Sequence, residues 1–125
     1  MYSVTVRSHV MIAHSLPGKF FGPAARLHGA TYVIDAEFRA PALDEHNVVI
    51  DIGEATRVLG EVAASLNYHN LDDDARFGGA LTTTEFLARW IHGEVAGHLR
   101  ASFRGTLKVT LHESHVASAA FEGAV

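Results

Sequence analysis

The chain of 125 residues contains no cysteine at all. This absence excludes disulfide bridges, a thiolate nucleophile and cysteine-ligated zinc. Any metal ion must therefore be held by histidine, aspartate or glutamate side chains. The chain has nine histidines, so a histidine-based metal site is a real option for it.

The chain also lacks both an excess of positive charge and a long apolar run. Its formal net charge of −4 offers no basic surface of the kind that binds nucleic acid or anionic membranes. No apolar stretch reaches the ~20 residues that a membrane-spanning helix needs. Arg7, His9 and His14 interrupt the first apolar stretch, which argues against a signal peptide. We expect a cytoplasmic protein whose partners are neither nucleic acid nor membrane.

Apolar residues are plentiful. They make up 48% of the chain, against 19% charged residues, which indicates a packed core and argues against disorder. The length is that of one ordinary domain, so we expect a single domain over residues 1–125.

Four segments read as strands: 2–14, 31–40, 107–112 and a weaker one at 117–121. In 31–40 the apolar side chains alternate with acidic and basic ones, as in an antiparallel strand that is buried on one face. Residues 15–25 contain two prolines and two glycines, which predicts a loop between the first two strands.

Two segments have the spacing of an amphipathic helix: one has an apolar stripe from Ala55 to Leu66, and the other runs from about 83 to 99. A capping box places an acceptor side chain at the helix start and a glutamate three residues later. This spacing is found in Asp51 with Glu54 and in Thr82 with Glu85. The polar, acidic segment 67–80 between the helices predicts a loop.

The predicted order is strand, strand, helix, helix, strand, strand. It indicates an α+β fold in which two helices pack on one face of a four-stranded antiparallel sheet (ββααββ). Such a sheet has two exposed edges, and proteins often protect sheet edges by pairing them with another subunit. We therefore expect a homo-oligomer closed through the sheet edges.

His14 and His28 are the leading candidates for metal ligands. His14 ends the first strand and His28 precedes the second, and neutral imidazole is the commonest protein ligand for zinc. A catalytic zinc usually has three protein ligands, so two histidines do not complete such a site. The plain alternative is a hydrogen-bonded histidine at each strand end.

Six short phrases, in the same order along the chain, resemble one known family. They are Ala13-His14, Leu27-His28-Gly29, Val49-Ile50-Asp51-Ile52, Asn70-Leu71-Asp72, Thr83-Thr84-Glu85 and Leu111-His112-Glu113-Ser114. They are similar to Ala-Ala-His, Leu-His-Gly-His, Val-Met-Asp-Phe, Asn-Leu-Asn, Thr-Thr-Glu and Val-Trp-Glu-Thr in the 6-pyruvoyltetrahydropterin and 6-carboxytetrahydropterin synthases. The resemblance implies the tunnelling fold, or T-fold, over almost the whole chain.

The resemblance implies a Zn²⁺ site, and His14 and His28 match two of its three histidines. The third would fall on Ala30, and the usual catalytic cysteine on Ala24. The family's Asp-His pair would fall on Asn67 and Tyr68. The chain therefore resembles a divergent member of the family, with one metal ligand and the usual proton-transfer residues replaced.

The substrate-anchoring positions of the family match Glu113, Thr84 and Glu85. A carboxylate can form two parallel hydrogen bonds with the N–H groups of a pterin or guanine edge. An exposed strand-end residue is the alternative for Glu113, and a helix-start role is the alternative for Glu85. Asp51 is most simply an N-cap.

Proton transfer would need residues other than those of the family, and we consider His115 and His69 for this catalytic role. His115 follows Glu113 by two residues, so a continuing strand would point both to the same side. The candidates for a third metal ligand are His115, ranked first, and His112, His9 and His69, although His9 would face away from His14. The remaining histidines, His46, His92 and His98, are expected at the surface.

Two functions remain open at this point. The first is a metal-assisted pterin lyase of altered specificity, acting on a carbon–oxygen bond to phosphate or on a carbon–carbon bond of a substrate like dihydroneopterin triphosphate. The second is a non-catalytic protein that binds pterins or purine-like molecules. Under either one, the resemblance implies a homo-oligomer, a trimer or a hexamer formed through sheet edges.

Overall fold

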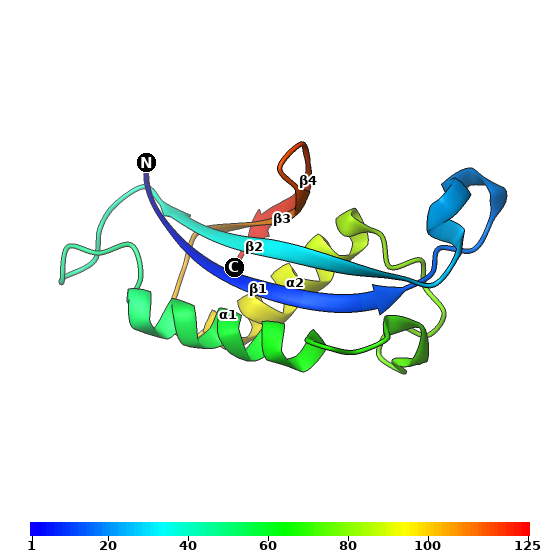
Figure 1. Ribbon diagram of the computed structural model, residues 1–125. Coiled ribbons are helices and arrows are strands. Elements are labelled where there is room, and N and C mark those ends of the chain that lie inside the picture. The colour runs from blue at the N-terminus through cyan, green and yellow to red at the C-terminus, as the bar shows by residue number, and fades with distance from the viewer.

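The computed structural model describes all 125 residues and contains one four-stranded antiparallel sheet, in the order β1-β2-β3-β4. The strands are β1 (Tyr2–His14), β2 (His28–Ala40), β3 (Thr106–Ser114) and β4 (Ala117–Ala124). The helices are α1 (Ile52–Leu66) and α2 (Thr84–Leu99). The predicted ββααββ order is confirmed (Figure 1).

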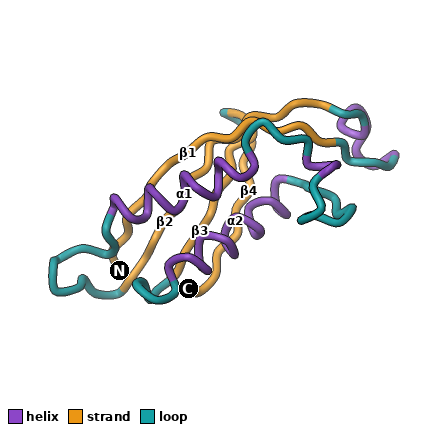
Figure 2. Tube along the Cα trace, turned by 90° about the horizontal axis from the view of Figure 1, so that it is seen from below, coloured by secondary structure: helices purple, strands orange, loops and turns teal.

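Both helices lie on the same face of the sheet, which makes the molecule two layers thick (Figures 1 and 2). Figure 2 also shows both chain termini at one end of the sheet, together with the loop that connects β2 to α1. The opposite end holds the C-terminal end of β1 and the start of α2. Neither helix combines the length and apolar character that crossing a membrane would require.

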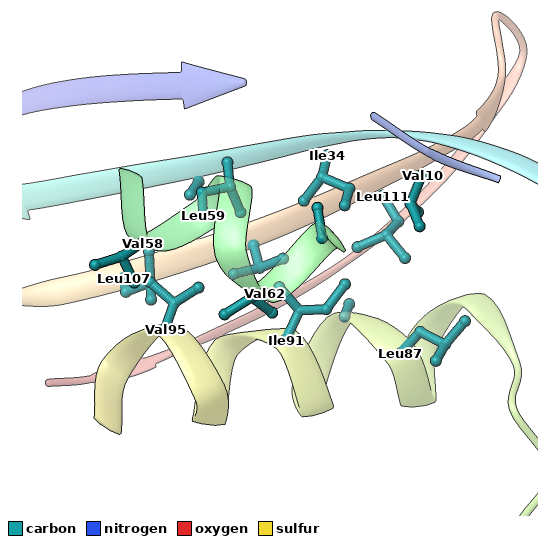
Figure 3. Close-up of a cluster of buried hydrophobic side chains, with 14 of the residues drawn as sticks. Val10, Ile34, Val58, Leu59, Val62, Leu87, Ile91, Val95, Leu107 and Leu111 are labelled. Carbon is teal, nitrogen blue, oxygen red and sulfur yellow. The ribbon is translucent and has the colours of Figure 1, made fainter. Parts of the chain in front are cut away.

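The core lies between the sheet and the helices. Alternate residues of each strand point toward the helices, and those of β2 from Tyr32 to Ala40 are almost completely buried. Helix α1 contributes one apolar stripe and α2 another, and these meet the sheet residues in one cluster of 26 buried residues. Figure 3 shows part of this cluster, including Val10, Ile34, Val58, Leu59, Val62, Leu87, Ile91, Val95, Leu107 and Leu111.

Helix α1 begins as the sequence predicts. The Asp51 side chain accepts hydrogen bonds from the backbone N–H groups of Gly53 and Glu54, at 2.8 and 3.4 Å. The return half of the capping box is not formed, because the Glu54 carboxylate pairs with Arg57 at 2.6 Å instead. Asp51 is therefore an N-cap.

The connections hold two short 3-10 segments that the sequence did not predict, Lys19–Ala25 and Leu71–Asp73. In the first, Gly22 adopts a positive φ of 55°, which breaks the segment into two turns. Strand β2 begins three residues earlier than predicted, so His28 is its first residue.

The surface position predicted for His92 is wrong. Its ring is buried between α2 and β4, where Nε2 lies 3.2 Å from the carbonyl oxygen of Gly123. The ring also contacts the edge of Phe121. Helix α2 packs against both β3 and β4, so its apolar face is wider than the stripe read from the sequence. His46 and His98 are exposed, as predicted.

The face of the sheet away from the helices is polar. Arg7 of β1 forms two hydrogen bonds with Asp35 of β2, at 2.7 and 2.8 Å. The Nε2 atom of His112 on β3 lies 2.9 Å from the same carboxylate. The three side chains cross three neighbouring strands, so this face carries a charged network where the other face carries the core.

Candidate functional site

The two candidate histidines face each other across the first strand pair. His14 and His28 are direct partners in the register of β1 and β2. Side chains of register partners lie on the same face of a sheet, and here that face is the one toward the helices. The ring centroids are 4.6 Å apart and the ring planes meet at 63°. The structure therefore brings the two imidazoles together.

Each imidazole is held through its Nδ1 atom. Nδ1 of His28 donates a hydrogen bond to the carbonyl oxygen of Arg26, at 2.8 Å. Nδ1 of His14 lies 3.0 Å from the hydroxyl oxygen of Thr82. Both rings therefore keep Nε2 for a ligand, and partners of this kind orient metal-binding histidines in proteins.

His14 is the more buried of the two rings, with 3% of its surface exposed. Burial lowers the pKa of the His14 imidazole below its ordinary value of 6.5, and the neighbouring His28 lowers it further. A lowered pKa favours the neutral imidazole, which is the form that binds a metal ion.

A cavity of about 210 Å³ opens beside the two histidines. Its polar wall includes Thr84 and Glu85 from the first turn of α2, together with Glu113 from the end of β3. Its remaining lining residues are Leu16, Phe21, Ala24, Tyr32 and Thr83. Three predicted binding residues and two predicted metal ligands thus line one cavity.

The start of α2 differs from the sequence prediction by one residue. The N-cap is Thr83, whose hydroxyl oxygen accepts a hydrogen bond from the Phe86 N–H group at 3.1 Å. The capping box predicted for Thr82 and Glu85 is therefore wrong. The Thr82 hydroxyl instead contacts His14, and Glu85 belongs to the cavity wall.

Tyr32 also lines the cavity, whereas the alternation in 31–40 predicts it only as a residue of the buried strand face. Its side chain is 1% exposed, and burial raises the pKa of its phenol above the ordinary value of 10.0. A contact with the Thr84 side chain opposes this shift, while Glu113 and Glu85 add to it. The sequence feature that could have indicated this place in the cavity is that Tyr32 lies four residues after His28, on the same strand face.

His115 and His69 do not line this cavity. Strand β3 ends at Ser114 after an irregularity between His112 and Ser114, so His115 lies in the exposed turn before β4. The strand continuation expected to align His115 with Glu113 is therefore absent. His69 lines a separate hollow of about 440 Å³, beside Tyr68 and Asn70.

The other candidates for a third metal ligand do not reach the pair. His112 contacts Asp35 on the opposite face of the sheet, and His9 lies on that face too, as expected. No other histidine, aspartate or glutamate forms a three-residue cluster with His14 and His28. Ala30 lies two residues after His28 on the same strand face, where its methyl group offers no ligand atom.

One group of three potential metal ligands lies elsewhere, in the exposed loop between β2 and α1. It consists of Asp44, Glu45 and His46, whose ligand atoms all lie within 4.8 Å of one another. Figure 1 places this loop at the end of the sheet opposite the start of α2. It is therefore separate from the cavity.

Asn67 and Tyr68, which match the family's Asp-His pair, lie between α1 and the edge of β1. The Asn67 side-chain oxygen accepts a hydrogen bond from the backbone N–H group of Met11, at 2.9 Å. Tyr68 is 79% exposed and adopts a φ of 62°, which is rare for a bulky residue. The following residues, His69 and Asn70, pair with Ala13 along the edge of β1.

Comparison with known proteins agrees with the resemblance read from the sequence. Residues 3–124 match the family described as 6-pyruvoyl tetrahydropterin synthase. A 6-carboxy-5,6,7,8-tetrahydropterin synthase of Bacillus subtilis (strain 168) is 26% identical over 94 residues. This alignment covers 73% of the present chain and 63% of that protein, so the chain spans less than two thirds of its length.

Solved structures show the same fold. The 6-pyruvoyl tetrahydropterin synthase of Caenorhabditis elegans has a TM-score of 0.84 at 19% identity, covering 98% of this chain and 95% of that chain. The enzyme of Plasmodium falciparum has a TM-score of 0.80 at 16% identity, covering 99% and 98%. The predicted T-fold is thus confirmed. With the family match along almost its whole length, the chain belongs to the 6-pyruvoyl tetrahydropterin synthase family.

Proposed function

We propose that the chain is a metal-assisted lyase-type enzyme acting on a pterin like dihydroneopterin triphosphate, with altered specificity. The observation that supports this most directly is the shared cavity. Two imidazoles with free Nε2 atoms and the carboxylates of Glu113 and Glu85 line the same small space. Its volume of about 210 Å³ lies below the ~300–1,000 Å³ of typical drug-sized pockets, which suits a compact heterocycle.

Glu113 would bind the heterocycle. Its carboxylate can accept two parallel hydrogen bonds from the amino and ring N–H groups of a 2-amino-4-oxo pterin. Thr84 and Glu85 lie at the first turn of α2, where backbone N–H groups and the positive end of the helix dipole favour a carbonyl oxygen or an anion. The wall formed by Leu16, Phe21 and Ala24 would cover the apolar ring faces.

His14 and His28 would hold a divalent ion such as Zn²⁺ through their Nε2 atoms. The two rings fit this role because both Nδ1 atoms are already hydrogen-bonded and the ring centroids lie only 4.6 Å apart in a T-shaped arrangement. With two protein ligands, the remaining coordination positions stay open to oxygen atoms of the substrate. A bound ion would supply Lewis-acid polarisation of these oxygens.

His115 and His69 remain the residues we propose for proton transfer. Neither lines the cavity, so each would act on a part of the substrate that projects beyond its mouth. The turn that carries His115 directly follows the strand end that carries Glu113.

A second candidate function, a pterin-binding protein without catalysis, is favoured by two observations. Ala24 places a methyl group in the cavity wall where the family resemblance puts a catalytic cysteine. Asn67 holds the backbone of β1 where the resemblance puts a catalytic aspartate. Catalytic groups that act as a unit lose most of their effect when one is missing.

One set of measurements distinguishes the two functions. We expect the purified protein to bind dihydroneopterin, and Glu113→Gln to weaken this binding at least tenfold because the bidentate acceptor is lost. Glu122→Gln, on the opposite sheet face, is the control and should bind as the wild type does. The first function, a metal-assisted lyase, further requires zinc-dependent turnover of dihydroneopterin triphosphate. His28→Ala should abolish this turnover. Binding without any turnover would support the second function, and no binding would contradict both.

A further inference from the structure

Tyr32 and Glu113 are neighbours at one end of the cavity. In the antiparallel register of β2 and β3, Val33 pairs with His112, so Tyr32 and Glu113 are the next residues along the two strands. Both line the cavity, and the charge of Glu113 acts on the Tyr32 phenol, as expected for neighbouring side chains. Tyr32, which is 1% exposed, therefore belongs to the part of the cavity where Glu113 would hold a heterocycle.

This end of the cavity is distinct from the end that carries the histidine pair. His28, Ala30 and Tyr32 alternate along the same face of β2. At about 3.4 Å per residue, the Cα atoms of His28 and Tyr32 are about 14 Å apart. Tyr32 therefore faces the heterocycle end of the cavity and not a metal ion held by the two histidines.

The Tyr32 hydroxyl lies beside the start of α2. The Thr84 side chain, in the first turn of that helix, is within hydrogen-bonding reach of the phenol. Burial raises the pKa of the phenol above its ordinary value, and the carboxylates of Glu113 and Glu85 add to this, so the hydroxyl keeps its proton near neutral pH. Ionised carboxylates only accept hydrogen bonds, whereas the phenol can donate one.

A carbonyl oxygen of the ligand would lie at the same place. In a pterin and in guanine, the ring carbonyl is bonded to the ring nitrogen whose N–H group Glu113 would bind. The backbone N–H groups of the first turn of α2 favour such an oxygen from the side of the helix. A carbonyl oxygen has two lone pairs, so it can accept a second hydrogen bond from the side of the sheet, where Tyr32 lies.

We propose that Tyr32 is a specificity-determining residue whose hydroxyl group donates a hydrogen bond to the carbonyl oxygen of a 2-amino-oxo heterocycle held by Glu113. The role rests on the proposed function only for the anchoring by Glu113, and it needs neither a metal ion nor turnover. Glu113 then recognises the donors of the heterocycle edge, and Tyr32 recognises its acceptor. Pterins and guanine share this edge, so the experiment includes both.

Pairs of ligands that differ in one atom test this role. Pterin and guanine each have a thioxo analogue, in which a sulfur atom, a weak acceptor, replaces the carbonyl oxygen while the N–H groups remain. We expect the wild-type chain to bind the oxo form about tenfold more tightly than the thioxo form in isothermal titration calorimetry. Tyr32→Phe should weaken binding of the oxo form about tenfold and leave binding of the thioxo form nearly unchanged, because only the oxo form loses a hydrogen bond.

Tyr2→Phe is the matched control. Tyr2 is 50% exposed and begins β1, at the opposite end of that strand from His14, so this variant should bind both forms as the wild type does. Circular dichroism checks that Tyr32→Phe keeps the fold. Equal affinity of the wild type for the oxo and thioxo forms would overturn the inference, and so would a Tyr32→Phe variant that weakens both forms equally or neither.

Failure of the proposed function gives a different result. Binding of guanine but not of pterin would contradict the proposed pterin substrate, while the oxo and thioxo forms of guanine would still decide the role of Tyr32. Pterin binding that Tyr32→Phe does not weaken would overturn this inference and leave the proposed function standing. Binding of neither heterocycle would contradict the anchoring by Glu113 and, with it, the role of Tyr32.

Discussion

At the scale of single residues, the site depends on which atom of each polar side chain is already used. His14 and His28 are useful to a ligand because their Nδ1 atoms are occupied and their Nε2 atoms are not. The charged network on the other face of the sheet shows the opposite case. There Asp35 has both carboxylate oxygens engaged, by Arg7 and His112.

This network predicts a pH-dependent contribution of Asp35 to stability. The Arg7 guanidinium, hydrogen-bonded to the carboxylate, holds the pKa of Asp35 below its ordinary value of 3.8, and His112 adds to this. The folded state thus binds the Asp35 proton less readily than the unfolded state, so the contribution is full above about pH 4 and is lost as the pH falls below it. Asp35→Asn should lower the free energy of unfolding at pH 7, and this deficit should shrink toward pH 3, measured by urea denaturation.

Glu122→Gln is the control for this prediction. Glu122 pairs with Arg39 on the same sheet face, but the Glu122 side chain is 47% exposed against 18% for Asp35, and exposed pairs contribute little. At pH 7, Glu122→Gln should lower the free energy of unfolding by less than Asp35→Asn does. If Asp35→Asn lowered the free energy of unfolding by the same amount at pH 7 and at pH 3, the role assigned to the carboxylate would be contradicted.

At the scale of secondary-structure elements, the three consecutive threonines at the start of α2 have different roles. Thr82 contacts His14, Thr83 caps the helix, and Thr84 is its first residue and lines the cavity. The residue at which the helix begins therefore determines that Thr83 caps α2, while Thr82 and Thr84 lie beside the cavity residues.

Because Thr83 is the residue that caps α2, its substitution should destabilise the helix start. Thr83→Ala should lower the free energy of unfolding by about 1 kcal/mol, because the Phe86 N–H group loses its acceptor at the helix start. Thr56→Ala is the matched control, since Thr56 is exposed inside α1, where alanine has the better helix propensity. It should be neutral or slightly stabilising in urea denaturation. If Thr83→Ala were equally neutral, the observed cap would not be the one that stabilises α2.

The sequence predicted the elements well because their spacing is a direct physical signal. Alternation identified β1 and β2, and the i, i+3, i+4, i+7 spacing identified both helices. The choice of cap was missed because the capping-box spacing identified Thr82, while adjacent threonines offer the same hydroxyl and only packing decides between them. His92 was misjudged because the sequence does not show how widely α2 contacts β4.

Prediction of the site succeeded where it depended on strand register and failed where it depended on irregular backbone. Two histidines at the ends of adjacent antiparallel strands must meet if the connection is a hairpin, and His14 and His28 do. His115 lies beyond a break in the register of β3, which nothing in the sequence marks. The role of Tyr32 was hidden because a cavity residue on a strand follows the same alternation as a core residue.

At the scale of the whole molecule, the sheet leaves two edges and one polar face uncovered by helices. The edge of β1 is partly covered near its end, because the Tyr68 N–H group donates to Met11 and the Ala13 N–H group donates to His69. The edge of β4 has no strand beside it along Ala117–Ala124. Unpaired edges of this kind favour pairing with another chain.

We therefore expect the protein to assemble through its edges, and the family resemblance implies a mass of three or six times the 13.5 kDa chain in sedimentation equilibrium. Proline substitutions in β4 test the interface, because neighbouring residues of an edge strand point their N–H groups in opposite directions, one toward β3 and one outward. Of Ala119→Pro and Ala120→Pro, one should disturb the pairing with β3 and lose stability. The other should keep the circular dichroism spectrum of the wild type and sediment as a single chain. A wild-type protein that sediments as one chain at micromolar concentration, or a folded proline variant that keeps the wild-type mass, would contradict assembly through β4.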